Sequence, residues 1–357
     1  MNQLSLFEPV PAVGESAPSD LPGQAPAAGS GPVGPAAVPA ELAEVAGKLP
    51  PTLRLGTSSW SFPGWAGIVW DRVHTATRLA RYGLAAYARH PLLTAAGIDR
   101  THYAPLPAAE LAAYAAAVPQ GFRFVVKAHE ACTVARWPDH ARYGARRGEV
   151  NPLFLDPAYA AAEVVAPYVE GLGATAGALL FQFAPQDLGP FGGPDRFVHR
   201  LGRFLATLPR GPRYAVEVRN KELLGPRYAA ALAAAGAIHC LNVHPRMPDL
   251  GTQARDAGAL VGPALLVRWM LGGDLSYEAA RQRYQPFDRL IDEAPAVRRT
   301  VAALALDAAS AGKPVYVVSN NKAEGSAPLT LFRLAELIAR LRSRGEPAAA
   351  PPDRSSP

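Results

Sequence analysis

Eight short runs of aliphatic and β-branched residues recur between residues 53 and 320, and alanine-rich amphipathic stretches lie between or after them. Strands that alternate with helices predict a parallel sheet covered by helices. A count of eight favours a closed (β/α)₈ barrel over an open doubly wound sheet. The expected strands are residues 53–58, 97–103, 122–127, 178–183, 214–219, 237–243, 265–269 and 315–320.

The helical stretches of this repeat are recognised by their alanine-rich amphipathic pattern. They are expected at residues 107–117, 157–169, 226–235, 297–311 and 329–342. The connection between the sixth and seventh strands, residues 245–262, is short and rich in Gly and Pro, so its helix is expected to be reduced or missing.

The chain on both sides of this repeat has the composition of a disordered segment. From Pro9 to about Pro39 it consists mostly of Pro, Ala, Gly and Ser. Such a segment cannot bury enough apolar surface to offset the entropy lost on ordering. We therefore expect a disordered arm at residues 1–50, a barrel at residues 51–343 and a short disordered tail at residues 344–357.

Composition narrows the class of protein. Hydrophobic residues make up 49% of the chain and charged residues 18%, which allows a large buried core. No run of about 18 apolar residues is present, so no membrane span is expected, and the first residues lack the pattern of a secretory signal. Cys132 and Cys240 can form neither a disulfide framework nor a CxxC zinc site. A cytoplasmic protein is expected.

Charge is distributed unevenly along the chain. The net charge is +6, with −4 in residues 1–50 and +9 in residues 51–340. A basic globular body favours polyanions such as nucleic acid or phosphorylated metabolites as partners. Many basic enzymes bind no nucleic acid, however, and no run of Lys and Arg here is longer than a pair.

Polar residues gather where the expected strands end. In a barrel these ends meet at one mouth, which holds the active site of enzymes with this fold. The residues expected to bind substrate there are Ser58, Ser59, Trp60, Trp65, Gln182, Asn242, His244, Arg268, Trp269, Asn320 and Asn321. The residues expected to take part in catalysis are Lys127, His129, Glu217 and Arg219.

Strand periodicity supports this grouping. Residues two apart share one face of a strand, which pairs Glu217 with Arg219, and Lys127 with His129. Buried polar groups of this kind are either paired or functional. In the functional interpretation, Glu217 or His129 is the general base. In the structural one, Glu217 and Arg219 form an ion pair and the histidines are satisfied core groups.

The residues of the predicted mouth also indicate which ligands it could bind. A phosphate can meet Lys127, Arg219 and Arg268, while a base or sugar stacks on tryptophan, with Trp70 also near the mouth. His102, His129, His244 and Glu217 can in principle ligate a metal. A metal cluster needs more His and carboxylate residues than this mouth has, so no metal and no other cofactor is expected.

Five motifs in chain order carry a family resemblance. They are residues 56–65 (GTSSWSFPGW), 122–128 (FRFVVKA), 180–185 (LFQFAP), 217–219 (EVR) and 320–327 (NN followed by Gly325 and Ala327). Together they resemble the YecE-like family, a domain-of-unknown-function family (number 72), over about residues 52–340. The resemblance implies a TIM-barrel fold and supplies no established reaction. The chain departs from the family pattern at residues 97–103, at Val134, and at Trp269 and Met270.

The first residues contain a short linear motif. Gln3, Leu4, Ser5, Leu6 and Phe7 resemble the pentapeptide through which bacterial polymerases and repair proteins bind the replicative sliding clamp. The three apolar side chains can fill apolar pockets, while the glutamine and the backbone supply directional hydrogen bonds. A flexible tether would hold the barrel near clamp-bound DNA. The alternative is that the pentapeptide arose by chance or packs on the barrel.

Three alternative functions follow from these observations. The first is an accessory protein of DNA repair or processing that acts on phosphodiesters and is recruited by the clamp. The second is an isomerase or hydrolase of a sugar or a phosphorylated metabolite, with no DNA role. The third is a non-catalytic binding module whose mouth recognises a ligand.

Overall fold

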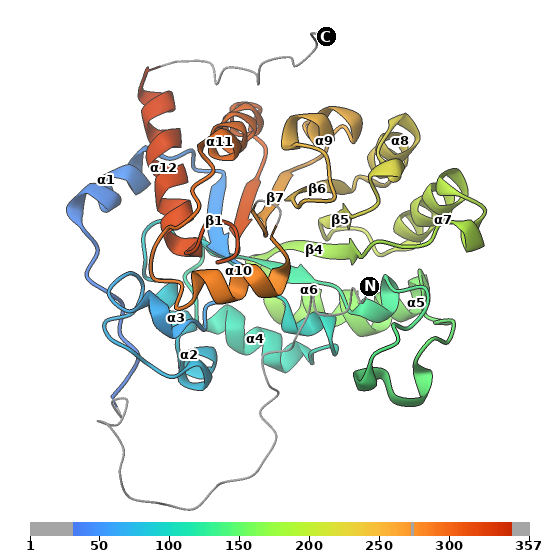
Figure 1. Ribbon diagram of the computed structural model, residues 1–357, viewed down its shortest axis with the longest axis horizontal. Coiled ribbons are helices and arrows are strands. Elements are labelled where there is room, and N and C mark those ends of the chain that lie inside the picture. The colour runs from blue at the N-terminus through green and yellow to red at the C-terminus, as the bar shows by residue number, and fades with distance from the viewer. Residues whose placement is uncertain (1–30, 273–274, 345–357) are drawn as a thin grey trace, which may run out of the picture.

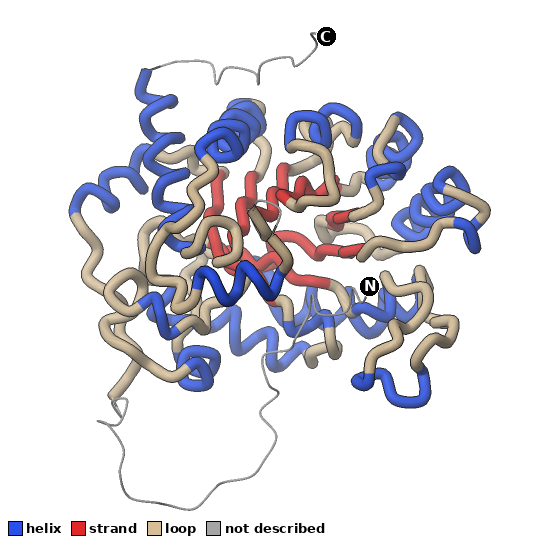
Figure 2. The backbone as a smooth tube through the Cα atoms, in the orientation of Figure 1, coloured by secondary structure: helices blue, strands red, loops and turns tan. Residues whose placement is uncertain are grey.

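The computed structural model describes residues 31–272 and 275–344, and these form a closed barrel of eight parallel strands in the order β1 to β8. Figure 1 shows the helices arranged around the barrel, and Figure 2 shows the strands in red inside a ring of blue helices. The strands are β1 (Leu53–Thr57), β2 (Ala95–Ile98), β3 (Arg123–Lys127), β4 (Ala176–Phe183), β5 (Tyr214–Val218), β6 (Ile238–Val243), β7 (Leu265–Trp269) and β8 (Val315–Ser319). The predicted fold is confirmed.

The helices lie outside the barrel and bury their apolar faces against it. They are α1 (Ala40–Lys48), α2 (Ala76–Tyr82), α3 (Leu84–Tyr87), α4 (Ala108–Ala116), α5 (Pro157–Tyr159), α6 (Ala166–Leu172), α7 (Pro194–Thr207), α8 (Pro226–Ala235), α9 (Leu250–Asp256), α10 (Tyr277–Tyr284), α11 (Pro295–Ser310) and α12 (Ala327–Arg344). A π-helical turn over Ala160–Val165 joins α5 to α6. As predicted, the connection between β6 and β7 holds only the short helix α9.

Alternate residues of each strand face opposite sides of the barrel wall. The inward residues form a small cluster of their own, which includes Val125, Leu180, Ala215, Leu266 and Val318. The outward residues belong to the larger core cluster that the strands share with the helices. Because the period of a strand is two, Glu217 follows Ala215 on the inward face, as predicted from the sequence.

Part of the segment predicted to be a disordered arm is ordered. Residues 31–50, assigned there to a disordered segment, include the helix α1, which packs against α12. Leu42 and Val45 of this helix lie partly buried against the core, and the guanidinium of Arg342 donates to the backbone oxygen of Lys48 at 2.9 Å. The correction has a physical reason: these apolar residues lie three apart in a segment without proline, so one helical face can be buried.

The second strand was also placed too late in the sequence. It was expected at residues 97–103, but β2 ends at Ile98 and a 3₁₀ turn follows at Arg100–His102. The hydroxyl of Thr101 donates to the backbone oxygens of Ile98 at 2.9 Å and of Lys127 at 2.6 Å, which stabilises this turn. The pleated pattern therefore stops before Asp99.

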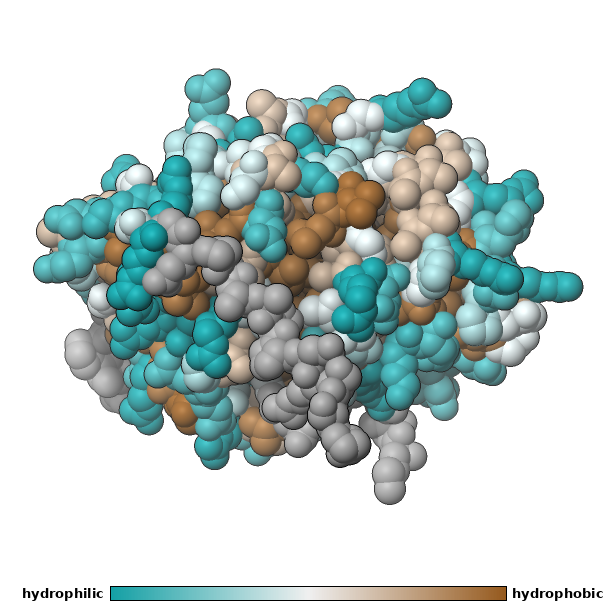
Figure 3. Space-filling view, turned by 90° about the horizontal axis from the view of Figure 1, so that it is seen from above, coloured by the Kyte–Doolittle hydropathy of each residue, from teal (hydrophilic) through white to brown (hydrophobic). Residues whose placement is uncertain are grey.

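The surface mixes polar and apolar side chains. In the view of Figure 3, hydrophobic side chains gather towards the centre of the face and hydrophilic ones border it. Large hydrophobic residues that are exposed among the described residues, such as Tyr82 and Val261, are far apart in the sequence. None of the helices that the structure describes is both long enough and apolar enough to cross a membrane.

Candidate functional site

Each barrel strand brings one polar residue to the C-terminal mouth. Each lies within one position of the last residue of its strand, and most are buried. In chain order they are Ser58, Asp99, Lys127, Gln182, Glu217, Asn242, Arg268 and Asn320. Their register places several of them side by side: Gln182 pairs with Glu217 across β4 and β5, and Asn242 pairs with Arg268 across β6 and β7.

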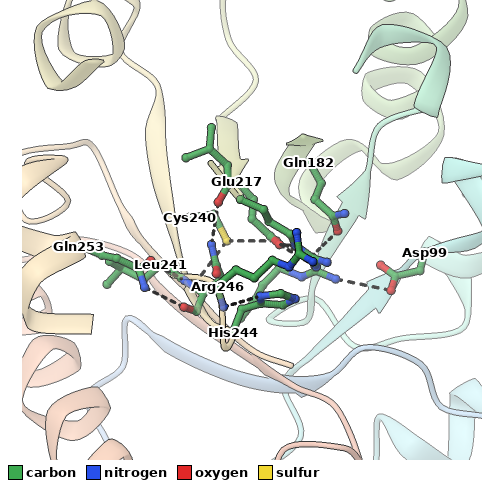
Figure 4. A network of polar contacts seen from close by, with 12 residues as sticks. Asp99, Gln182, Glu217, Cys240, Leu241, His244, Arg246 and Gln253 are labelled. Carbon is green, nitrogen blue, oxygen red and sulfur yellow. Dashed lines mark hydrogen bonds and ion pairs between the residues drawn. The ribbon is translucent and has the colours of Figure 1, made fainter. Parts of the chain in front are cut away.

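Glu217 is the centre of a buried ion network (Figure 4). Its Oε1 accepts from Nε and Nη2 of Arg219, both at 3.1 Å, and its Oε2 accepts from Nη1 of Arg268 at 2.5 Å. The same Arg268 nitrogen donates to Oε1 of Gln182 at 3.0 Å. The Cys240 thiol lies 4.0 Å from Oε2 of Glu217. Such a network fixes the positions of its members, because any one of them left unpaired would be costly.

The carboxylate of Glu217 is held in its ionised form. Burial by itself raises the pKa of Glu217, but the charges of Arg268 and Arg219 outweigh it and bring the pKa to about 2. A carboxylate with this pKa is a counter-ion for the two guanidiniums, and it does not take up a proton near neutral pH. The arrangement therefore favours the ion-pair interpretation of Glu217 over its predicted role as general base.

Lys127 has the opposite character. Burial lowers its pKa to about 7; the charge of Asp99 opposes this shift, and the charges of Arg268 and Arg219 add to it. Its side chain projects from the last residue of β3 and is only 2% exposed. An amine that is partly neutral at pH 7 can act as a base or a nucleophile, which an ordinary lysine cannot do.

Asp99 belongs to the mouth, although the sequence analysis did not select it. Its Oδ2 lies 3.6 Å from Nη2 of Arg268, and its side chain is 39% exposed, so it faces both the network and solvent. The misplaced second strand hid this residue, because Asp99 was expected in the middle of a strand. With the strand ending at Ile98, the position of Asp99 matches that of Ser58 after β1.

Lys322 is a second lysine of the mouth that the sequence analysis missed. Its Nζ donates to Oδ1 of Asn320 at 3.2 Å and lies 4.0 Å from the centre of the Tyr277 ring on α10. Burial and the charge of Arg281 lower the pKa of Lys322 to about 8. Its position directly after the Asn320–Asn321 pair was the available sequence signal.

The predicted residues of β1 and β8 mainly connect structural elements. Nδ2 of Asn320 donates to the hydroxyl of Ser58 at 2.9 Å. The hydroxyl of Ser59 forms a hydrogen bond with that of Ser61 at 3.2 Å. Oδ1 of Asn321 accepts from the Trp65 indole at 3.2 Å and from the backbone of Ala327 at 2.9 Å. Asn321 thus ties the loop after β1 to the start of α12.

The two predicted histidines have different surroundings, and His244 is drawn within the polar network of Figure 4. His129 leaves the mouth, and its Nδ1 pairs with the hydroxyl of Tyr159 at 2.6 Å. Nδ1 of His244 accepts from the backbone of Arg246 at 3.2 Å. Burial, together with Arg146 for His129 and Arg219 for His244, lowers the pKa of each imidazole to about 4. Both histidines are therefore neutral near pH 7.

The tryptophans that were predicted at the mouth lie buried in the core. Trp60, Trp65, Trp70 and Trp269 are at most 7% exposed and belong to the core cluster between the barrel and the helices. Trp269 lies on the outward face of β7, because it follows the inward Arg268. These rings stabilise the fold and offer no open face on which a base could stack.

A cavity of about 300 Å³ adjoins the mouth on one side. It lies between the connection from β6 to α9 and the first turns of α11, and Asn242 and His244 are among its lining residues. The rest of the lining is mostly apolar, with Met247 and Val297 as examples. Nδ2 of Asn242 donates to the backbone oxygen of Val218 at 3.2 Å. Within the described residues, no three His, Cys, Asp or Glu side chains gather as metal ligands do.

These features define the class of the protein: an eight-stranded α/β barrel with a buried, charged mouth at the C-terminal ends of its strands. The chain belongs to the family described as "Protein of unknown function DUF72", whose model matches residues 54–354. The family resemblance expected from the five motifs is confirmed.

Solved structures of DUF72 family proteins are similar to this chain in fold. The protein from Enterococcus faecalis V583 has a TM-score of 0.56 and 20% identity, covering 80% of this chain and 95% of its own. The protein from Thermotoga maritima MSB8 has a TM-score of 0.52 and 17% identity, covering 80% and 98%. No curated protein matches the chain.

Proposed function

We propose that the barrel is an enzyme that binds a small anionic substrate at its mouth and transfers a proton through Lys127. The observation that carries this proposal is the charge of the mouth. Lys127, Arg219, Arg268 and Lys322 bring four basic groups, against the two carboxylates of Asp99 and Glu217. Two further carboxylates act on the lysines, Glu130 and Glu278, but they pair with Arg142 and Arg281, so the basic groups remain in excess. An excess of basic groups in a site with little water favours an anionic ligand such as a phosphate or carboxylate.

The depth of the mouth supports a small substrate. Glu217, Arg268 and Lys127 are at most 2% exposed, so a large flat surface such as a duplex cannot touch them. A single phosphate ester, a carboxylate or one extruded nucleotide is small enough for such a site, and Asp99, at 39% exposure, is the part of the network that reaches solvent.

The chemistry follows from which groups can change their ionisation. Glu217 and the two guanidiniums stay charged near neutral pH. Their proposed role is therefore to orient the substrate and to stabilise charge that develops on it. Lys127 can accept or donate a proton, and Asp99 is a partly exposed carboxylate whose charge acts on it. Proton transfer by a positioned lysine fits an isomerase or a hydrolase.

Thermal unfolding of the full chain tests this proposal. Inorganic phosphate and pyrophosphate are added, with sodium chloride at matched ionic strength as the reference. A ligand present at about 100 times its Kd stabilises by roughly 2.7 kcal/mol, so Tm should rise. Lys322→Met should reduce the rise, whereas the exposed Lys221→Met should not. A rise that chloride reproduces, or that both variants keep, would contradict the proposal.

A second candidate function rests on the N-terminal pentapeptide. We propose that Gln3, Leu4, Ser5, Leu6 and Phe7 dock on a bacterial sliding clamp and bring the barrel to DNA, where one nucleotide or a phosphodiester would be the substrate. The supporting observation is the match of all five positions to the clamp-binding peptide. These residues lie outside the part of the chain that the structure describes.

Clamp affinity tests the docking directly. Binding of the full chain to a purified sliding clamp is compared with that of the Leu6→Ala/Phe7→Ala variant, and loss of binding is expected. Titration with single-stranded and double-stranded DNA at two salt concentrations tests the barrel, because phosphate contacts weaken as salt rises. If the wild-type chain does not bind the clamp, the recruitment proposal is wrong.

A further inference from the structure

The chain uses its two kinds of basic residue unequally. Only five of the 36 Lys and Arg residues are lysines, namely Lys48, Lys127, Lys221, Lys313 and Lys322. Lys48 and Lys221 are exposed, and Lys313 donates to the backbone oxygen of Leu260. The other two lysines, Lys127 and Lys322, are both buried and both lie in the mouth.

A positive charge alone does not explain lysine at these two places. Arginine provides the charge almost everywhere else in the chain, including the mouth itself at Arg219 and Arg268. A guanidinium cannot lose its proton in a protein, whereas an amine can. An amine is therefore needed where the nitrogen must offer its electron pair to a proton or to a carbon atom.

We infer that Nζ of Lys127 forms an imine with the carbonyl carbon of a small aldehyde or ketone that carries an anionic group. The inference rests on the proposed function, because it names the substrate of the same mouth. The amine belongs to the last residue of β3, which is buried at the mouth, and the charges of Asp99, Arg268 and Arg219 act on it. Buried amines held among cationic groups are the usual source of Schiff-base lysines.

The step balances with the groups that are present. The electron pair of the neutral amine attacks the carbonyl carbon and the C=O π bond breaks. The nitrogen then loses one proton and the oxygen gains one, which gives a carbinolamine. This hydroxyl then takes a second proton and leaves as water, while the nitrogen loses its remaining proton and the C=N bond forms. Asp99, which faces both solvent and the network, can carry these protons. No oxidant or reductant is required.

The surrounding charges suit an imine of an anionic compound. Burial keeps part of the Lys127 population neutral near pH 7, as its pKa of about 7 indicates. Glu217 is occupied by Arg219 and Arg268 and does not compete for the proton of the amine. Lys322, held by Asn320 and the Tyr277 ring, provides a cation for the substrate anion.

Reductive trapping on the full chain tests the inference. Glyoxylate is the probe for a carboxylate-bearing carbonyl compound, and glyceraldehyde 3-phosphate is the probe for a phosphate-bearing one. Sodium borohydride reduces any imine to a stable secondary amine, and mass spectrometry of peptides locates it. We expect one adduct, on Lys127, formed at least ~10-fold faster than on the exposed Lys221.

Variants provide the controls. Lys127→Arg should lose the adduct, whereas Lys221→Arg should keep it. Peptide mapping of the wild-type chain locates the adduct even if Lys127→Arg does not fold. Labelling that spreads over the exposed lysines, that falls on Lys322, or that is absent with both probes would overturn the inference.

Phosphate binding separates this inference from the proposed function. Stabilisation by phosphate without an adduct on Lys127 would leave an anion-binding mouth and reject the imine. An adduct on Lys127 that excess phosphate prevents would support both. An adduct that phosphate does not affect would support the imine and contradict the shared anion site.

Discussion

Glu217 and its two guanidinium partners lie where almost no water reaches them, since Glu217 is 0% and Arg268 2% exposed. Each buried ion loses its hydration, and only the attraction of its charged partners compensates for that loss. The ions are therefore stable only as a group. Lys127 lies among the same charges, but its pKa is lowered to about 7. The mouth thus combines a buried carboxylate and guanidinium that stay charged with two lysines, Lys127 and Lys322, whose pKa values are lowered towards neutrality.

Replacing Glu217 by Gln should destabilise the protein strongly. The change removes the carboxylate that Arg219 and Arg268 share, and breaking a buried ion pair by removing one partner typically costs about 3–5 kcal/mol. Asp195→Asn is the matched control, because the Asp195–Arg227 pair is exposed and should contribute less than about 1 kcal/mol. Urea unfolding measures both variants. Equal losses in the two variants would show that the network does not hold the mouth together.

Lys127 should make stability depend on pH in a known direction. Its pKa falls from 10.5 in the unfolded chain to about 7 in the folded chain, so between these values the unfolded state binds more protons. Wild-type stability, relative to Lys127→Met, should therefore rise as the pH increases from about 7 to about 10, by at most about 1.4 kcal/mol per pH unit. Below pH ~7 the difference should become constant.

Urea unfolding of both chains at several pH values measures this difference, and Lys221→Met serves as the control because Lys221 is exposed. If the difference between wild type and Lys127→Met does not change over this range, Lys127 is not held in its neutral form.

At the residue scale, the sequence predicted the inward groups but missed two residues that follow strand ends. Glu217, Arg219 and Lys127 were found because strand period and position both point to them. Asp99 and Lys322 follow the ends of β2 and β8, where no periodic pattern exists, and only the closed barrel brings them to the same mouth. Trp269 was wrongly placed because its position at a strand end was considered without the face on which it lies.

At the scale of elements, the strands of this barrel could be predicted more closely than its accessory helices. A strand buried on both sides is a continuous apolar run, which the sequence displays directly. The helix α1 could not be distinguished from its proline-rich surroundings, because its burial depends on contact with α12 at the far end of the chain. The helix α10 is polar on average and is recognised only from its packing beside the mouth.

Two glycines in neighbouring elements should respond to alanine with opposite signs. A Cβ at Gly56 in β1 would lie 2.1 Å from the backbone oxygen of Ala95 in β2, so Gly56→Ala must push the two strands apart. We expect a loss of roughly 1–3 kcal/mol or more. Gly47 in α1 has nothing within 4 Å, so Gly47→Ala should stabilise by up to about 1 kcal/mol through helix propensity.

Urea unfolding again gives the measurement. If Gly56→Ala proved neutral, the close contact between β1 and β2 would not be as tight as the barrel requires, and the glycine of the first family motif would lack this explanation.

For the whole molecule, the two proposed functions use parts of the chain that are separate in sequence. The mouth is built from all eight strands, so a change there acts on the barrel as a unit. The pentapeptide at residues 3–7 lies more than twenty residues before the first described residue, and its proposed binding to a clamp needs only its own side chains and backbone. The proposals therefore predict two activities that mutations can separate.

We expect a double dissociation between two variants. Leu6→Ala/Phe7→Ala should lose binding to the sliding clamp and keep both phosphate stabilisation and the borohydride-trapped adduct on Lys127. Lys127→Arg should lose the adduct and bind the clamp as the wild type does, because no residue of the mouth contributes to the pentapeptide. Clamp affinity, Tm with phosphate and peptide mass spectra, measured on the same preparations, give all three readouts. A pentapeptide variant that also loses the adduct would mean that residues 3–7 act on the mouth itself, and the model of two independent parts would then be wrong.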